Sequence, residues 1–374
     1  MLFTYKHIPH HIEKLQEYLD FLFHNVWIVA KGNFNYRKLK GNKELYDICI
    51  QLEIDDTEWG NFFNGRIAWI FDEFVKIKDD KFKKDLIKAY KANNNIKKLC
   101  EDKSSLPITY DDIERQYPDL AKALKSFYGR IYGSSSPFNL KVFGFLNDKL
   151  IAEYDVKFME ANNKEVCPFC GINHLKGNNH SYREAYDHYI PKGLYPFNSL
   201  NFKNLAPMCH ECNSTYKLSK VPIYNNDVKK IDPLIKETHR SLAFFPYAKS
   251  HPNIEIKIDL KSKDIINLRP SEIDLKIEAT GYDEHVDTWL RVFGMEERYK
   301  ALLCSPSEGK AWFDSIIDEF ENATELSEIN DAESYYKAQL KDAKKVPLSS
   351  YGFIKSVFLE ECKTKGLFKN ETPK

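Results

Sequence analysis

The chain has 374 residues, of which 43% are apolar and 29% are charged, so it is long enough for two or three domains with hydrophobic cores. Its 55 basic residues balance its 55 acidic residues, which excludes an overall positive field that would draw it to nucleic acid. We find no signal-peptide pattern and no run of about eighteen apolar residues, so we expect a cytoplasmic protein with no membrane partner.

Residues 1–150 are expected to form a helical N-terminal region. Apolar residues recur every three or four positions at residues 12–23, which predicts an amphipathic helix. Thr109 is suited to capping a helix that begins at Tyr110. Further helices are expected at residues 43–52, 59–77, 80–100 and 119–132, and a loop is expected at residues 133–137.

The helix expected at residues 80–100 is rich in lysine. Its lysines are Lys81, Lys83, Lys84, Lys88, Lys91, Lys97 and Lys98. A run of this kind is most often a solvated face, and a contact with a DNA backbone is the alternative.

Two pairs of cysteines with the same spacing mark residues 151–230, which we expect to form a central module. The pairs are Cys167 with Cys170 and Cys209 with Cys212. Two such pairs can supply four thiolates to a tetrahedral Zn²⁺, so we expect a structural zinc site. The alternative is a set of buried or disulfide-bonded cysteines, although thiols persist in a reducing compartment. His210 is the substitute ligand if one sulfur is not used.

The polar residues between and beside these pairs are suited to phosphodiester hydrolysis. An imidazole with an ordinary pKa of about 6.5 can take a proton from water at neutral pH, and His188 stands beside the carboxylate of Asp187. Asp187 and Asn213 offer the oxygen ligands that Mg²⁺ or Mn²⁺ prefers. The amide of Asn204 is suited to holding the loop so that His188 points inward. A histidine after an aspartate is usually structural, so the interpretation depends on the whole set.

In order and spacing these residues resemble the HNH nuclease family, over roughly a seventh of the chain. Asp187 and His188 match the family's first motif, Asn204 the second, and Asn213 the third, where a histidine is commoner. The resemblance implies a ββα-metal fold, with Asp187 and His188 on the first strand of a hairpin, Asn204 in the loop that follows, and Asn213 on a helix. It also implies a metal-dependent endonuclease that leaves a 5′-phosphate and a 3′-hydroxyl, with a structural zinc and a catalytic Mg²⁺ or Mn²⁺.

Residues 231–374 are expected to form a C-terminal region that has a small β-sheet followed by helices. Apolar and charged residues alternate at residues 254–260, which predicts a half-buried strand. Further strand segments are expected at residues 265–268 and 273–277. Helices are expected from residue 283 onward and at residues 307–322, 332–344 and 350–365. The last five residues are expected to be disordered.

Together these features predict an α+β protein that is mostly helical around a central HNH module. The flanking regions, chiefly residues 289–299, resemble the nuclease subunit of Septu-type and retron-associated antiphage systems. That resemblance implies a DNA substrate and a partner ATPase or other defence subunit. Two alternatives stay open: a zinc-stabilised scaffold that binds nucleic acid or a partner and has lost catalysis, and an HNH-type toxin that acts on RNA. The isolated cysteines are expected to be packing residues: Cys49, Cys100, Cys304 and Cys362.

Overall fold

A computed structural model describes most of the chain, namely residues 1–132, 143, 150–177, 179–180, 184–228, 231, 233–325 and 329–368. The loop expected at residues 133–137 and the tail expected at residues 370–374 lie outside the described residues. About 55% of the chain is helical and two antiparallel pairs of strands are present, which confirms the expected mostly helical α+β class. No helix among the described residues is long and apolar enough to cross a membrane.

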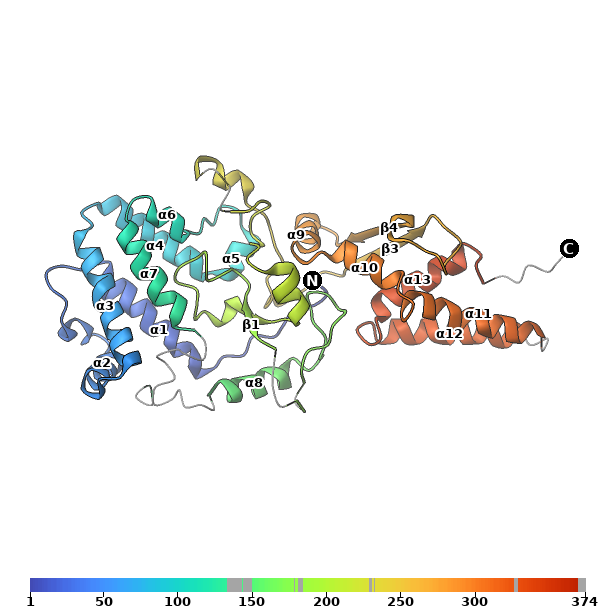
Figure 1. Ribbon diagram of the computed structural model, residues 1–374, viewed down its shortest axis with the longest axis horizontal. Helices are drawn as coiled ribbons and strands as arrows, with labels where there is room; N and C mark the ends of the chain where they lie inside the picture. Colours follow the sequence, from blue (N-terminus) through green and yellow to red (C-terminus); the bar gives the residue numbers. More distant parts are fainter. Residues whose placement is uncertain are drawn as a thin grey trace. The chain divides into compact units, whose positions relative to one another are not determined.

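The chain forms two compact units (Figure 1). The N-terminal unit comprises Thr4–Asn163 and Lys176–Lys249, and the C-terminal unit comprises Met1–Phe3, Lys164–Leu175 and Ser250–Lys374. Both units are discontinuous in sequence, whereas the regions expected above, with boundaries at residues 150 and 230, are consecutive.

Helices dominate the N-terminal unit. In chain order they are η1 (His11–Glu13), α1 (Lys14–Phe21), the π-helix η2 (Leu22–Trp27), η3 (Tyr36–Leu39), α2 (Lys43–Asp55), α3 (Glu58–Lys76), α4 (Asp80–Asn94), α5 (Ile96–Glu101), α6 (Tyr110–Glu114), α7 (Pro118–Arg130), α8 (Leu150–Ala161), η6 (Phe202–Asn204), the π-helix η7 (Cys212–Lys217) and η8 (Pro233–His239). Strands β1 (Tyr186–His188) and β2 (Leu205–Pro207) pair with each other.

Local side-chain chemistry sets several of these helix boundaries. The predicted cap at Thr109 is confirmed, because its hydroxyl accepts a hydrogen bond from the Asp112 amide in a capping box. The prediction of a single helix at residues 80–100 is wrong, because α4 ends at Asn94 and α5 begins at Ile96. Asn95 has a non-helical backbone, and its side-chain oxygen accepts from the Lys98 amide at 3.1 Å. A competing side-chain cap therefore divides the lysine-rich segment into two helices.

The core of the N-terminal unit is built from aromatic residues on helices that pack together. Helix α3 packs against both α2 and α7. The indole of Trp27 is buried and donates to the Ile67 carbonyl at 3.1 Å, and the rings of Phe63 and Phe127 lie 5.9 Å apart. Burying these large rings supplies much of the hydrophobic stabilisation of the unit.

The C-terminal unit contains one two-stranded sheet and five helices among its described residues. The sheet consists of β3 (Glu255–Leu260) and β4 (Ile273–Glu278), paired antiparallel with Glu255 opposite Glu278. A 3₁₀ turn, η9 (Pro270–Glu272), leads into β4. The helices are α9 (Asp283–Phe293), α10 (Met295–Leu303), α11 (Gly309–Glu325), α12 (Ile329–Lys345) and α13 (Gly352–Thr364). Helices α11, α12 and α13 pack together, and α13 also covers β3 (Figure 1).

The strand expected at residues 265–268 is wrong, because this segment turns between β3 and β4. The Leu268 amide donates to the Ile265 carbonyl at 3.2 Å, and the Asp264 side chain accepts from the Asn267 amide at 3.1 Å. Ile265 and Leu268 are both buried, so their apolar character reflects anchoring of a turn rather than strand pairing. The Asp264 carboxylate thus takes the Asn267 amide that a strand would have used for pairing.

Candidate functional site

A short hairpin and the helical turn after it position all four residues expected to act in hydrolysis. Asp187 and His188 are the last two residues of β1, which pairs with β2 so that Asp187 lies opposite Ala206. Asn204 ends the turn η6 directly before β2, and Asn213 lies on η7. The order of elements is thus strand, turn, strand and helix, all within the N-terminal unit.

His188 is held in one orientation by its surroundings. Its side chain is buried, and its Nε2 lies 2.9 Å from the Ser199 carbonyl oxygen. Since a carbonyl only accepts, Nε2 must carry the proton and the lone pair must be on Nδ1. The Tyr132 ring meets the imidazole edge to face, with the ring centres 4.7 Å apart. The histidine is therefore a fixed neutral imidazole with a defined basic nitrogen.

Burial, together with the positive charges of Lys192 and Lys217, lowers the pKa of His188 to about 3, although the hydrogen bond to Ser199 opposes this shift. The imidazole is thus in its basic form throughout the neutral range. A phosphate anion placed beside it would raise this pKa, because a neighbouring negative charge favours the protonated form.

Asp187 forms an ion pair with Lys217, a residue to which the motifs assign no role. The Lys217 Nζ lies 2.6 Å from Asp187 Oδ2 and donates to the His188 carbonyl at 3.0 Å. Burial raises the pKa of Asp187 and lowers the pKa of Lys217, and in each case the partner's charge opposes the shift. A lysine this deeply buried is stable as a cation only beside such a partner. The pair ties η7 to the end of β1.

Asn204 holds the chain directly after His188. Its side-chain oxygen accepts from the Ile190 amide at 2.8 Å, and its side-chain nitrogen donates to the Ile190 carbonyl at 2.9 Å. The Asn204 carbonyl accepts from the Tyr189 amide at 2.8 Å. Asn204 is fully buried, so these bonds form without competition from water. Three hydrogen bonds thus tie residues 189–190 to the start of β2.

The segment before Ser199 is in a backbone conformation that is unusual for its residues. Phe197 has a φ of 80°, in the left-handed region that large side chains rarely adopt. Its ring is buried against Phe23, Tyr90 and Tyr128, with ring centres 4.8 to 5.5 Å away. These contacts stabilise the strained backbone two residues before Ser199, whose carbonyl accepts the hydrogen bond from His188. Strain retained in this way is often found at functional sites.

A second carboxylate approaches the hairpin from α8. Asp155 hydrogen-bonds to Tyr186, whose pKa is raised by burial and by that carboxylate. Burial also raises the pKa of Tyr132 to about 12, with further contributions from Asp155 and Asp187. The carboxylates of Asp155 and Asp187 therefore both lie close enough to Tyr132 to affect the pKa of its hydroxyl. In the sequence, Asp155 is one of several polar residues on an amphipathic helix. Nothing in the sequence therefore predicts that it lies near the hairpin.

Asn213 is joined to the second cysteine pair through its backbone. The backbone N–H of Asn213 donates to the Cys209 carbonyl at 3.0 Å. Among the described residues, no side-chain hydrogen bond joins Asn213 to Asp187. Lys217, four residues further along η7, holds the carboxylate instead. Residues four apart share one face of a helix, so Asn213 and Lys217 lie on the same side of η7. The two proposed oxygen ligands thus lie on β1 and η7, the two elements that the Asp187–Lys217 ion pair joins.

The four cysteines of the two pairs come together. Cys167, Cys170, Cys209 and Cys212 are buried, form no disulfide bonds, and have sulfur atoms that all lie within 4.8 Å of one another. Tetrahedral Zn–S bonds of about 2.3 Å would place the sulfurs about 3.8 Å apart, so the cluster fits a metal such as zinc. Within the described parts of the chain, the other group of this kind is His10, His11 and Glu153, which is more exposed.

The backbone around each cysteine pair is arranged to stabilise thiolates. The Ile172 amide donates to the Cys170 sulfur and the Cys212 amide donates to the Cys209 sulfur, both at 3.4 Å. The turn after Cys170 requires glycine, because Gly171 has a φ of 67° and an added Cβ would lie 2.2 Å from Leu2. Amide hydrogen bonds to sulfur favour the charged form that binds a metal.

Side chains of α9 and α10 support the first cysteine pair within the C-terminal unit. The Trp289 indole donates to the Phe169 carbonyl at 2.6 Å, and the Tyr299 hydroxyl donates to the Cys170 carbonyl at 2.8 Å. The rings of Phe169 and Phe293 are stacked with centres 5.0 Å apart. The segment at residues 289–299, which carried the resemblance to antiphage nucleases, thus has a structural task in this chain.

The hairpin therefore presents a neutral imidazole with its lone pair on Nδ1 and an adjacent carboxylate held by a buried lysine. This combination is suited to accepting a proton from water beside a negatively charged substrate. Comparison of the chain with family models, curated proteins and solved structures finds no match in any of the three.

Proposed function

We propose that this chain is a cytoplasmic, metal-dependent endonuclease of the HNH type that hydrolyses phosphodiester bonds of DNA. The observation that carries the proposal is the state of His188. Its Nε2 proton is committed to the Ser199 carbonyl, so Nδ1 is free to accept a proton from the attacking water.

The other residues of the hairpin have roles that follow from their contacts. Asp187 and Asn213 would provide oxygen ligands to Mg²⁺ or Mn²⁺, which when bound would stabilise negative charge on the phosphate and the leaving oxygen. Lys217 keeps the Asp187 carboxylate in place at the end of β1. Asn204 keeps residues 189–190 in register, so the imidazole stays aligned.

The four cysteines would bind a structural Zn²⁺ through thiolates stabilised by the two amide-to-sulfur hydrogen bonds. His210 is exposed, whereas all four cysteines are buried, which supports an all-sulfur ligand set. A partner ATPase or other antiphage-defence subunit is part of the proposal through the sequence resemblance alone.

The test compares the wild-type chain with two variants, His188→Ala and His210→Ala, on supercoiled plasmid DNA with Mg²⁺ or Mn²⁺. We expect the wild type and His210→Ala to cut the DNA, EDTA to stop them, and His188→Ala to lose at least about 100-fold in rate. Zinc is counted by mass spectrometry before and after chelation. All three proteins are expected to carry one zinc per chain, which shows that His188→Ala has folded.

Three other outcomes of this experiment would favour a different function or a different catalytic base. Cleavage of RNA, with DNA left intact, would favour a toxin that acts on RNA. If the zinc-loaded protein cuts neither substrate, alone or co-purified with partners from its host, the nuclease proposal is wrong and a binding scaffold is favoured. Full activity in His188→Ala would exclude His188 as the base.

A further inference from the structure

A concave site lies within the N-terminal unit, apart from the hairpin residues described above. It is a cleft of about 1080 Å³ whose walls come from the N-terminal segment, α1, η2, α4, α5, η6 and residues 245–249. Asp187, His188, Asn204 and Asn213 do not line it. Its volume is at the upper end of the range for small-molecule sites in proteins.

The walls of this cleft are strongly basic. Five lysines line it, and they are Lys6, Lys91, Lys97, Lys203 and Lys249. All five are exposed. Asp20 is the one carboxylate among the described lining residues, and it already accepts hydrogen bonds from Tyr90 at 2.5 Å and Gln16 at 2.9 Å. Positive charge is therefore concentrated in this cleft, although the whole chain has no net charge.

Few of these lysines have an acidic partner in the part of the chain that the structure describes. Lys97 lies 3.7 Å from Glu101 on its own helix, an exposed pair that contributes little. Among the described residues, Lys6, Lys91, Lys203 and Lys249 form no ion pair. Ammonium groups held near one another repel, and an anionic ligand would relieve that repulsion.

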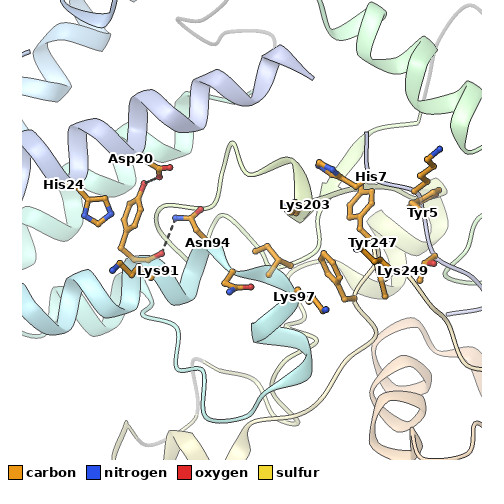
Figure 2. A pocket seen from close by; sticks show the side chains of 17 residues that line it. Tyr5, His7, Asp20, His24, Lys91, Asn94, Lys97, Lys203, Tyr247 and Lys249 are labelled. Atoms are coloured by element: carbon orange, nitrogen blue, oxygen red, sulfur yellow. Dashed lines mark hydrogen bonds between the residues drawn. The ribbon is translucent and has the colours of Figure 1, made fainter. Parts of the chain in front are cut away.

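The lysines converge from separate parts of the chain. Of the seven lysines in the lysine-rich segment, Lys91 and Lys97 line the cleft, and the other five lie outside it. The remaining cleft lysines come from residues 6, 203 and 249. Figure 2 shows Asp20, His24 and Lys91 toward one end of the cleft, and His7, Tyr247 and Lys249 toward the other. Positive groups at both ends suit a ligand with more than one anionic group.

The aromatic side chains of the cleft serve as rigid walls rather than as stacking surfaces. Tyr90 is stacked on Phe23 with ring centres 4.0 Å apart, and its relative exposure is 2%. Tyr247 is also buried, and its hydroxyl donates to the Leu205 carbonyl. With little ring surface free to stack on a base, recognition depends on the ammonium groups, and phosphate oxygens are their usual partners.

We propose that this cleft is a binding site for a ligand that carries two or more phosphate groups, from one of two sources: a nucleoside triphosphate or a short stretch of single-stranded nucleic acid. The inference does not rest on the nuclease proposal, because none of the cleft lysines takes part in the proposed hydrolysis.

The test measures binding to the 374-residue chain carrying His188→Ala, without added Mg²⁺, so that cleavage does not interfere. ATP is titrated by calorimetry, and a labelled twelve-residue oligothymidylate is titrated by fluorescence anisotropy. The cleft variant combines Lys91→Gln, Lys97→Gln, Lys203→Gln and Lys249→Gln. The matched control combines Lys81→Gln, Lys83→Gln, Lys84→Gln and Lys88→Gln, which removes the same charge from α4 outside the cleft.

We expect at least one of the two probes to bind, with affinity at least ~10-fold weaker for the cleft variant and changed less than ~3-fold for the control. If the source is nucleic acid, the dependence of log K on log salt should also become shallower by about 0.7 for each phosphate that the cleft variant no longer neutralises. Tighter binding of ATP identifies a nucleotide site, and tighter binding of the oligonucleotide identifies a strand site. The proposal is overturned if neither probe binds below ~1 mM, or if the two variants weaken binding equally. Thermal unfolding verifies that both variants are folded.

Discussion

Replacing Lys217 by methionine tests the ion pair that joins η7 to β1. Methionine keeps most of the length of the side chain but removes its charge. The exposed fractions are 1% for the lysine side chain and 17% for that of Asp187, so the substitution leaves a carboxylate largely buried without its partner. It also removes the donor to the His188 carbonyl. Removing one member of a buried pair costs about 3–5 kcal/mol, and we expect the lower half of that range because Asp187 is partly exposed.

The loss in the free energy of unfolding caused by Lys217→Met should depend on pH. Burial already raises the pKa of Asp187 in the folded chain, and losing Lys217 would raise it further. The folded variant would then bind a proton that the unfolded chain releases, so its stability falls as pH rises. The destabilisation relative to wild type is therefore expected to be larger at pH 8 than at pH 5.

Urea denaturation followed by circular dichroism measures the free energy of unfolding at both pH values, and hydrogen exchange at the Tyr189 amide reports local opening. The control is the double variant Lys217→Met with Asp187→Leu, which removes both charges. We expect it to regain about 2 kcal/mol relative to Lys217→Met alone. A single variant within 1 kcal/mol of wild type, or a double variant as unstable as the single one, would refute the reasoning.

Three further predictions concern neighbouring groups. Asn204→Ala leaves the buried amide and carbonyl of Ile190 without partners, so it should cost about 2–4 kcal/mol in urea denaturation, and an unchanged midpoint would contradict this. Because burial lowers the pKa of His188 to about 3, the wild type should lose stability as pH falls below about 6.5, by about 2 kcal/mol at pH 5, whereas His188→Ala should lack this loss. A stability difference between these two proteins that stays constant from pH 7.5 to pH 5 would be the opposing result. Cys209→Ser should lose bound zinc while Cys304→Ser keeps it, as measured by mass spectrometry, and equal zinc in both would exclude the cluster as the metal site.

Local patterns in the sequence predicted several features of the fold. The alternation at residues 254–260 corresponds to β3, and the cap at Thr109 was predicted from one hydroxyl and its spacing. These features depend on hydrogen bonds and periodicity within a few residues. Where a local pattern failed, as at Asn95 and at residues 265–268, a side chain competed with the regular backbone bonds.

The sequence also indicated which residues of the hairpin are candidates for chemistry, but not their partners. Asp187 and His188 are adjacent in the chain, so a motif can identify them. Nothing near Ser199 or Lys217 distinguishes these residues from other serines and lysines. Their roles arise because the chain returns to β1 after 11 and 29 residues, respectively.

By itself, the sequence determined a mostly helical α+β chain with two spaced cysteine pairs and an Asp-His pair between them, because each of these features is set by neighbouring residues. Only the tertiary structure decided that the four sulfurs meet, that Lys217 holds Asp187, and that five lysines share one cleft. Those arrangements depend on burial and on contacts between distant segments, and the pKa of a group such as His188 is set by that environment rather than by residue type.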